Sequence, residues 1–513
     1  MLRKIRIILA AIFFLGITLL FLDYTGTVHA WLGWMAKIQF LPAVLAANVL
    51  VIAGLIILTL LFGRVYCSVI CPLGVMQDII SWFRGKLKKK NKFRFGYSPA
   101  NNWMRYGMFA LFIVAIIAGI HIIVAVMAPY SAYGRIASNI IAPIYHWSEL
   151  GSGIFEEWSE RAATYRAYDT EIWIKSIPVF IIAVSTFIIT FMLAWQKGRT
   201  WCNTVCPVGT TLGFLSRFSL FAPVINTEKC NKCGLCGKAC KSSCINTKEH
   251  KVDYSRCVAC MDCISNCKQG AISFGMRYKS AANSASATYQ AVSMKKCETK
   301  EAEANVDRRM FLTTGLLMAT AATIKAQDMK VDGGLADIDY AMQPRRKTPI
   351  VPAGAKSLRR FNDHCTGCQL CVSVCPNQVL RPSNDLETLM QPEMSYERGY
   401  CRPECNKCSQ VCPAGAIKPI TAAEKSSIQI GHAVVDPKLC VINTDGVKCL
   451  HCIRVCPAHA IKTVLKNPDD PNSPRIPVVL EEKCIGCGKC ENLCPARPLA
   501  AIHVEGHEVH RHI

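Results

Sequence analysis

The chain has 513 residues, of which 51% are hydrophobic and 30 are cysteines, and its net charge is +23. The length allows several domains. Because nearly all cysteines fall in tight clusters, the chain is neither a small disulfide scaffold nor a protein with scattered core cysteines. The charge would suit a nucleic-acid binder, but eight basic residues and no acidic residue fall within 84–105, between two apolar segments. A membrane-facing cytoplasmic loop explains that block better, so we expect no nucleic-acid partner.

Four apolar segments can each cross a bilayer, whose apolar core of ~30 Å needs roughly 20 helical residues. They lie near 5–22, 41–62, 106–128 and 174–195. Basic residues precede the first segment and follow the second and fourth, whereas the loop at 149–171 is mostly acidic. Basic loops stay on the cytoplasmic side. The sequence therefore predicts a four-helix membrane domain over residues 1–212, with both of its ends in the cytoplasm.

A repeated motif follows the second and fourth segments, as "GRVYCSVICPLGVMQ" and "GRTWCNTVCPVGTTL". Both contain Gly-Arg, then Cys-x-x-x-Cys-Pro, then a glycine, and the proline ends a continuous helix. Three interpretations are open: a metal cluster at the membrane edge, a redox dithiol pair, or a structural turn. We expect one metal site shared by all four cysteines, since it would supply a centre for electron transfer there. The four are Cys67, Cys71, Cys202 and Cys206.

Two clusters with the spacing C-x2-C-x2-C-x3-C come next, "CNKCGLCGKAC" and "CVACMDCISNC". In bacterial ferredoxins of this spacing, three thiolates of one loop converge on a [4Fe–4S] cluster and the fourth cysteine serves the neighbouring cluster. Zinc is disfavoured, because structural zinc sites use two C-x2-C pairs separated by a longer loop. We expect a dicluster domain over 225–275 with crossed ligand sets, namely Cys230, Cys233, Cys236 and Cys267, and Cys257, Cys260, Cys263 and Cys240.

This domain departs from the ferredoxin pattern in one respect. Cys240 is followed by Lys241, where ferredoxins usually carry proline, and Cys267 is also followed by lysine. Cys244 is therefore an alternative ligand in place of Cys240. Cys297 has no partner nearby, and we expect it to be a free thiol.

A polar, Ala/Ser-rich stretch at 276–306 suits a linker. The segment that follows, "DRRMFLTTGLLMATAATIKAQ" at 307–327, places Arg308 and Arg309 before 15 uncharged residues. This is the pattern of a twin-arginine export signal, which would remain as a tether or be removed. The alternative is a short amphipathic linker with an accidental arginine pair.

Four further cysteine clusters fill the C-terminal part, and each ends in Cys-Pro: "CTGCQLCVSVCP", "CRPECNKCSQVCP", "CLHCIRVCP" and "CIGCGKCENLCP". The second has one additional residue in its first interval, and the third is completed by an isolated cysteine upstream. Crossed pairing predicts two dicluster modules within 350–513. The expected ligand sets are Cys365, Cys368, Cys371 with Cys412; Cys401, Cys405, Cys408 with Cys375; Cys440, Cys449, Cys452 with Cys494; and Cys484, Cys487, Cys490 with Cys456.

With these motifs in order, residues 1 to about 275 resemble the NapH-type membrane ferredoxins of periplasmic nitrate reduction, and residues 307–513 resemble the NapG-type partner. The chain is similar to a fusion of the two. The resemblance implies a membrane domain joined to small α+β ferredoxin-like domains, in the bacterial inner membrane, with the C-terminal half in the periplasm. Regulators of nitrous-oxide respiration and methylamine-utilisation ferredoxins are wider relatives, so the terminal acceptor stays open.

The resemblance also implies a function. Six [4Fe–4S] clusters would carry electrons from menaquinol or ubiquinol to a periplasmic reductase or cytochrome, with the chain as a subunit of a quinol dehydrogenase or as an electron carrier. No Cys-x-x-Cys-His haem motif and no Gly-x-Gly-x-x-Gly nucleotide motif is present. Two other functions stay open: donating electrons for maturation or reactivation of a periplasmic metalloenzyme, and acting as a membrane scaffold.

Quinol oxidation needs a proton acceptor, and an ionisable residue within a membrane segment is a functional candidate. His121 lies inside the third segment, and we expect it to take this role. His29, His146 and Glu149, which we expect near the periplasmic edge of the membrane, are weaker candidates. The C-terminal "HVEGHEVHRHI" has four histidines, for which a solvated tail is the expected state and metal binding is the alternative.

Overall fold

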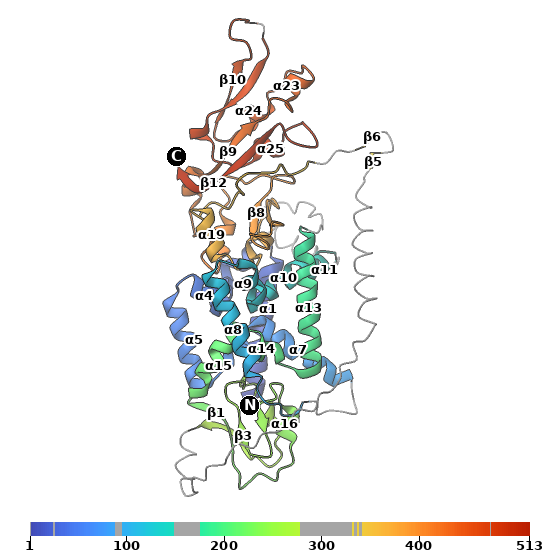
Figure 1. Ribbon diagram of the computed structural model, residues 1–513, viewed down its shortest axis with the longest axis vertical. Coiled ribbons are helices and arrows are strands. Elements are labelled where there is room, and N and C mark those ends of the chain that lie inside the picture. Colours follow the sequence, from blue (N-terminus) through green and yellow to red (C-terminus); the bar gives the residue numbers. More distant parts are fainter. Residues whose placement is uncertain are drawn as a thin grey trace.

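In the computed structural model, the described residues are 2–23, 26–87, 95–147, 175–277, 331–332, 336–337, 341–471 and 473–513. They form three parts along one long axis (Figure 1). A helical unit of residues 2–218 lies in the middle. An N-terminal cysteine module, residues 221–277, lies at one end, and the C-terminal region, residues 341–513, lies at the other.

The helical unit consists of long helices and several short ones. Two glycines with positive φ, Gly63 (+73°) and Gly198 (+71°), end the helices Val49–Phe62 and Ile177–Lys197 at the start of each repeated motif. Asn48, Asn101 and Ser176 cap the helices that follow them with their side chains. The elements are α1 (Leu2–Leu22), α2 (Thr27–Leu32), α3 (Trp34–Lys37), α4 (Phe40–Leu45), α5 (Val49–Phe62), α6 (Val65–Val69), α7 (Pro72–Leu87), α8 (Asn102–Ile117), α9 (His121–Met127), α10 (Pro129–Ile136), η1 (Ala137–Ile141), α11 (Ala142–Trp147), α13 (Ile177–Lys197), α14 (Thr200–Thr204), α15 (Pro207–Leu215) and η2 (Ser216–Phe218).

Two of these helices, α1 and α13, are long and apolar enough to cross a membrane, with 21 residues each. The prediction of four continuous spans is therefore wrong for the second and third segments. The second is broken between α4 and α5, where Ala47 has φ +52°, and the third is broken at Gly119, with φ +71°. The remaining apolar helices, α5 and α8, have 14 and 16 residues.

The N-terminal cysteine module is a small α+β unit. The strands β1 (Phe221–Ile225) and β4 (Ile272–Met276) pair antiparallel from Phe221–Met276 to Ile225–Ile272, so they close the module at its two chain ends. Between them lie two short helices and a two-residue hairpin, α16 (Leu235–Ala239), β2 (Ile245–Asn246), β3 (Lys251–Val252) and α17 (Asp262–Ser265).

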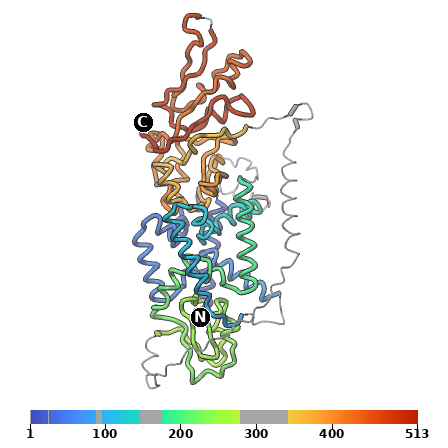
Figure 2. The backbone as a smooth tube through the Cα atoms, viewed as in Figure 1, coloured from blue at the N-terminus to red at the C-terminus, as the bar shows by residue number. Residues whose placement is uncertain are grey.

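The C-terminal region contains two units, stacked beyond the helical unit (Figure 2). The first C-terminal module, residues 350–427, has α19 (Leu358–His364), α20 (Leu370–Ser373), β7 (Leu380–Pro382), β8 (Pro392–Met394), α21 (Lys407–Val411) and α22 (Ala422–Ser427). The second, residues 428–513, has β9 (Ile428–Val435), α23 (Val441–Thr444), α24 (His451–Val455), β10 (Ile461–Leu465), β11 (Arg475–Val479), η3 (Glu481–Lys483), α25 (Lys489–Asn492) and β12 (Ile502–His512). Short strands β5 (Val331–Asp332) and β6 (Ala336–Asp337) pair upstream.

One hydrophobic core joins the helical unit to the first C-terminal module. It includes Phe21 and Tyr130 of the helical unit together with Leu370 and Val372 of the module. Polar contacts cross the same boundary, since Asn139 Nδ2 donates to Gln369 Oε1 at 2.8 Å and Ser176 Oγ donates to Asn384 Oδ1 at 2.5 Å. The two parts therefore pack as one body rather than as a tethered pair.

The C-terminal histidines are not in a solvated tail. They lie on β12, which pairs antiparallel with β9 from Ile502–Val435 to His512–Ile428. Alternating apolar residues on this strand, such as Val504 at 0% exposure, pack it into the second module. The expectation from the sequence was wrong because polar histidines masked the period-two pattern of a strand.

Candidate functional site

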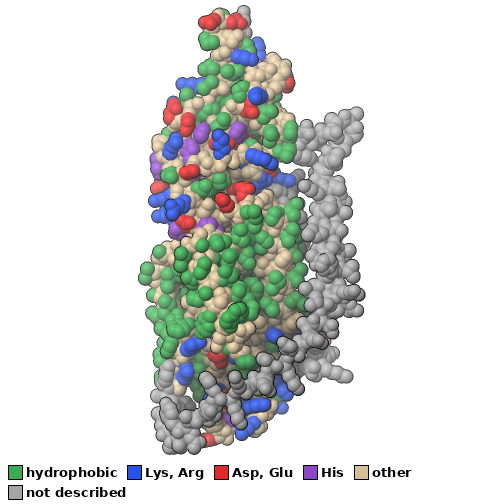
Figure 3. Space-filling model, in the orientation of Figure 1, with side chains coloured by type: hydrophobic (Ala, Val, Ile, Leu, Met, Phe, Trp, Pro, Cys, Tyr) green, Lys and Arg blue, Asp and Glu red, His purple; other side chains and the backbone are tan. Residues whose placement is uncertain are grey.

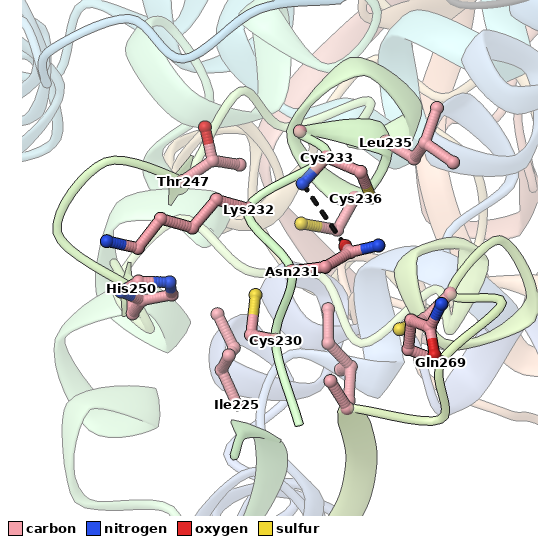
Figure 4. Close-up of a pocket in the computed structure, with 14 residues that line it drawn as sticks. Ile225, Cys230, Asn231, Lys232, Cys233, Leu235, Cys236, Thr247, His250 and Gln269 are labelled. Carbon is pink, nitrogen blue, oxygen red and sulfur yellow. Dashed lines mark hydrogen bonds between the residues drawn. The ribbon is translucent and has the colours of Figure 1, made fainter. Parts of the chain in front are cut away.

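The first cysteine centre is a cavity in the N-terminal module (Figure 4). Its lining includes the sulfurs of one loop and the last cysteine of the other, which are Cys230, Cys233, Cys236 and Cys267. Asn231 holds the loop by accepting a hydrogen bond from the Cys233 backbone N–H at 3.3 Å. Four convergent thiols fit the ligand set of a [4Fe–4S] cluster.

The second centre of this module is a cavity lined by Cys257, Cys260, Cys263 and Cys240, and also by Cys244. The sulfurs of Cys240 and Cys244 lie 3.4 Å apart. Both cysteines therefore face the same space. The hydrogen bond from Cys244 lowers the pKa of Cys240 and raises that of Cys244.

The C-terminal region repeats this arrangement. One cavity is lined by Cys401, Cys405, Cys408 and Cys375, and another by Cys484, Cys487, Cys490 and Cys456. In the other two sets the thiols lie close enough to shift one another's pKa. Burial raises the pKa of Cys368 to about 12, and the nearby Cys412 thiol adds to the shift. Likewise burial raises the pKa of Cys452 to about 11, and Cys449, Cys494 and Cys440 add to it. The structure thus brings together each expected set.

Buried cations lie beside two of these cysteine sets, where they would offset the negative charge of a thiolate-ligated cluster. The Lys425 ammonium donates to Cys401 Sγ at 3.1 Å. Arg135 of α10 is fully buried, and Gly134 next to it lies against the carbonyl of Cys368. Arg135 donates to the Ala125 carbonyl at 2.9 Å, but its Nε and Nη2 have no hydrogen-bond partner among the described residues. Such an orphaned guanidinium fits an anionic cluster beside it.

The two Cys-x-x-x-Cys-Pro motifs meet in the helical unit. The four cysteines are each 4% exposed, and the thiol of Cys206 interacts electrostatically with the three others. Gln77 Nε2 lies 3.3 Å from Cys202 Sγ. Sulfur from both halves of the repeat therefore converges on one buried place, which fits a shared metal site and also a dithiol pair.

Each half of the repeat holds the other through its arginine. Arg64 Nη2 donates to the Cys202 carbonyl at 2.9 Å, and Arg199 Nη1 donates to the Cys67 carbonyl at 2.7 Å. The Gly-Arg pair was visible in the sequence, but its role was not. The repeat itself carried the signal, because it preserves both arginines at the same distance from the cysteines.

The glycine after each Cys-Pro leaves room for these reciprocal hydrogen bonds. A Cβ on Gly74 would lie 2.3 Å from the Cys67 carbonyl oxygen, and one on Gly209 would lie 2.1 Å from that of Cys202. Real Cβ atoms do not approach oxygen so closely, and the added atom would also lie 2.6 Å from Arg199 Nη1 or 2.8 Å from Arg64 Nη2. Any side chain here would therefore displace the arginine that comes from the other half. The two halves are related as a pseudo-twofold pair down to these contacts.

A buried ion-pair network ties the N-terminal module to this place. Asp78 of α7 contacts Arg199 (2.8 Å), Arg6 (2.8 Å) and Lys241 (3.5 Å), and Lys241 also contacts Asp262 at 3.0 Å. Although burial raises the pKa of Asp78, these cations hold it well below its usual range. Lys241, the residue that replaces the usual proline, thus docks the module onto the helical unit.

Hydrogen bonds link neighbouring cysteine centres at both ends of the molecule. The Arg64 Nη1 that serves the four-cysteine site also donates to the Ser255 carbonyl at 3.1 Å, two residues before Cys257. At the far end, the Cys401 N–H donates to the Cys487 carbonyl at 2.9 Å, so the two C-terminal modules touch at their cysteine loops.

The expected proton-transfer residues lie apart from one another. His121 begins α9, with Nε2 3.9 Å from Asp363 Oδ1 of the first C-terminal module, so it lies at the seam between the two parts. His29 is held by Asp23 at 3.0 Å. The side chain of His146, and also Glu149, Cys297 and the arginine pair Arg308 and Arg309, lie outside the described residues.

Three families match parts of the chain. Residues 44–90 and 176–225 match the 4Fe-4S binding domain, residues 364–430 the 4Fe-4S dicluster domain, and residues 448–505 the LdpA Fe-S cluster-binding domain. The expectation of ferredoxin-like dicluster domains is confirmed by these matches. No solved structure matches the chain.

Curated relatives match different parts of the chain. The methylamine utilization ferredoxin-type protein MauM of Methylophilus methylotrophus is 32% identical over 158 residues, which are 30% of this chain and 69% of MauM. The ferredoxin-type protein NapG of Escherichia coli is 27% identical over 181 residues, 32% of this chain and 77% of NapG. The putative electron transport protein YccM of E. coli is 28% identical over 228 residues, 44% of this chain and 55% of YccM.

Proposed function

The chain belongs to the NapH/NapG-like family of 4Fe-4S electron-transfer proteins, and we propose that it conducts electrons from membrane quinol to an acceptor on the outer side of the membrane. The observation that carries this proposal is the placement of cysteine modules at opposite ends of one helical unit, with the four-cysteine site between them (Figure 1). When bound, [4Fe–4S] clusters supply one-electron centres. The protein sets their order, potential and access.

A membrane location is supported by the outer surface of the helical unit. Hydrophobic side chains cover the middle of the molecule, whereas charged side chains gather over both ends (Figure 3). Many of these hydrophobic side chains are exposed, for example Leu50 at 82% and Ile117 at 81%. Lipid would cover a surface that water penalises. On this proposal the short helices α4, α5, α8 and α9 complete two broken spans, giving four crossings.

The basic loop at 84–105 then marks the cytoplasmic side, and the C-terminal region lies on the opposite, periplasmic side. Export of a folded domain of this kind is the task of a twin-arginine signal, so Arg308 and Arg309 would direct it. The N-terminal module stays in the cytoplasm, where Arg199, Lys241 and Asp78 hold it against the helical unit.

Short bonded links connect the four-cysteine site to the first C-terminal module. Tyr66, next to Cys67, accepts a hydrogen bond from the Phe40 N–H at 3.1 Å. Phe40 begins the six-residue helix α4, which spans about 9 Å at ~1.5 Å per residue. Ala46, at its other end, lies against Gly415, three residues after Cys412. These contacts connect the four-cysteine site with the first C-terminal module inside the protein, across part of the ~30 Å that a bilayer core spans.

His121 is the proposed proton acceptor for quinol oxidation. It lies at the seam between the helical unit and the first C-terminal module, and its side chain is 18% exposed. Asp363, 3.9 Å away, would carry the proton onward to the outer side. Quinol bound at this seam would release protons outside and electrons to the adjoining cysteine centres.

Quinol oxidation by the purified, iron-loaded protein tests this function. We expect a menaquinol analogue to reduce the iron–sulfur centres and to support turnover with an artificial acceptor. Reduction only by a cytoplasmic donor would favour the maturation or reactivation role. Reduction by neither would leave the scaffold role, and both outcomes would overturn the proposal.

A further inference from the structure

Three metal-ligating side chains meet in the second C-terminal module, outside the cysteine sets. His432 lies on β9, His507 on β12 and Glu481 in η3. His432 Nδ1 and His507 Nε2 are 2.8 Å apart, and they lie 3.9 Å and 4.0 Å from the same Oε1 atom of Glu481. His507 is 8% exposed, and its Nδ1 has no partner among the described residues.

The three atoms define the position of an ion. For a triangle with sides of 2.8, 3.9 and 4.0 Å, the equidistant point lies about 2.1 Å from each corner, the product of the sides divided by four times the area. Zinc bonds to histidine nitrogen and to carboxylate oxygen are roughly 2.0–2.2 Å long. We propose that His432, His507 and Glu481 bind one divalent first-row transition-metal ion, with water at its remaining positions.

The fold keeps these donors together. Glycines face each other on the two strands at Gly431 and Gly506, and a Cβ on Gly431 would lie 2.2 Å from the Glu505 carbonyl oxygen. The strands therefore approach closely just before the histidines. The register shifts between Gly506 and Arg511, the segment that contains His507.

The site lies against a cysteine loop. The Ala433 N–H, next to His432, donates to Cys484 Sγ at 3.4 Å, and Gln429 Nε2 donates to the Cys484 carbonyl at 2.8 Å. Glu481 precedes Cys484 by three residues. A bound ion would join β9, β12 and the Cys484 loop and would place positive charge beside that centre.

One cation competes with the metal. Arg511 Nη1 lies 3.1 Å from Glu481 Oε1, the atom that the ion would use. Its side chain is 63% exposed, so it can leave without disturbing the core. Removing this charge should therefore tighten metal binding. If the two imidazoles only shared a hydrogen bond and bound no metal, the change would have no such effect.

Zinc binding to the full, iron-loaded chain tests the proposal. The protein is purified anaerobically, treated with chelator, dialysed against Zn²⁺ and analysed for zinc and iron. We expect one zinc per chain, with more than about tenfold weaker binding for His432→Gln and His507→Gln and tighter binding for Arg511→Gln. Glu481→Gln, at a half-exposed position, gives a second test if a histidine variant does not fold.

The matched control is His503→Gln, on the same strand, where His503 pairs with Glu505 at 3.3 Å outside the three-residue cluster. It should bind zinc as the wild type does. Equal loss in His503→Gln and His507→Gln would indicate an adventitious histidine-strand site only and would overturn the proposal, as would the absence of zinc in the wild type. Because the readout is metal content, failure of quinol oxidation does not affect this test.

Discussion

Arg135 is a residue of the helical unit that lies beside a cysteine set in another part of the chain. It is fully buried, and two of its nitrogen groups find no partner among the described residues. Its neighbour Gly134 touches the backbone of Cys368. A positive charge in a low-dielectric interior favours the more negative, reduced state of a nearby cluster.

Replacing Arg135 with Gln should therefore lower the midpoint potential of the centre held by Cys365, Cys368, Cys371 and Cys412 by tens of millivolts. Potentiometric titration followed by electron paramagnetic resonance measures this value. Arg135→Lys, which keeps the charge, should restore most of the potential. Arg359→Gln, at an exposed position of the same module, is the matched control. An unchanged potential in Arg135→Gln would show that the guanidinium only fills space.

Cys240 and Cys244 offer a choice of ligand that geometry leaves open, since both line one cavity. The hydrogen bond from Cys244 lowers the pKa of Cys240 and raises that of Cys244. Because thiolate is the ligand form, Cys240 deprotonates first. We predict that Cys240→Ser loses the cluster of Cys257, Cys260 and Cys263, whereas Cys244→Ser keeps it. Iron analysis decides, and the reverse result would assign the ligand to Cys244.

Among the elements, the half-helices around the four-cysteine site depend most on close packing. Gly74→Ala and Gly209→Ala each place a methyl group against a cysteine carbonyl at 2.3 and 2.1 Å. The same methyl groups would lie 2.6 Å from Arg199 Nη1 and 2.8 Å from Arg64 Nη2, the arginines that come from the opposite half. We predict that either change displaces the bridging arginine and removes the iron held there, about four atoms if the site is a [4Fe–4S] cluster. Gly54→Ala and Gly107→Ala, where a Cβ meets nothing within 4 Å, should keep the wild-type iron content. Full iron in Gly74→Ala would reduce the motif to a structural turn.

The broken segments show what hydropathy along a sequence cannot predict. The apolar composition of 41–62 and 106–128 was correctly identified, but composition carries no information about the path of the backbone. Ala47 and Gly119 turn the chain at positive φ. The turns are stabilised by contacts with Tyr66 and the C-terminal region, which are remote in sequence. The long uninterrupted helices α1 and α13 match their predicted segments.

For the molecule as a whole, Asp78 anchors one end to the middle. Asp78→Asn removes the buried carboxylate that Arg199 shares with Lys241, and it leaves Lys241 with Asp262 alone. Removing one partner of a buried ion pair costs about 3–5 kcal/mol. We predict faster amide hydrogen exchange in α16 and α17 of the variant. Lys251→Gln, at an exposed position of the same module, should exchange as the wild type does. Equal exchange in Asp78→Asn would mean that other contacts dock the module.

The same ion pairs give a pH dependence. Because the pKa of Asp78 is depressed in the folded protein, the charged carboxylate stabilises the docked state at pH values above the unfolded pKa of ~3.9. This stabilisation is lost progressively as pH falls from that value toward the folded pKa. Hydrogen exchange of the docked module should therefore be constant near neutral pH and increase below about pH 4. In Asp78→Asn this acid-induced increase should be smaller.

The sequence predicted the local part of each centre and missed the long-range part. Ligand spacing follows from a loop of a few residues, so the structure brings together the same thiols that the crossed pattern predicted, as at Cys267 with Cys230. The reciprocal arginines and the docking role of Lys241 join residues over 100 positions apart. No local pattern contains that information, although the repeat and the missing proline marked the positions.

The central claim is that the four-cysteine site joins the two ends of the molecule into one electron path. The most direct test uses iron-loaded protein in sealed lipid vesicles, with an impermeant oxidant trapped inside and an impermeant reductant outside. We predict protein-dependent reduction of the trapped oxidant, and more than about tenfold slower reduction with the Cys71→Ser, Cys206→Ser double variant when the ferredoxin-type clusters are intact. Equal rates for the wild type and the double variant would contradict the account.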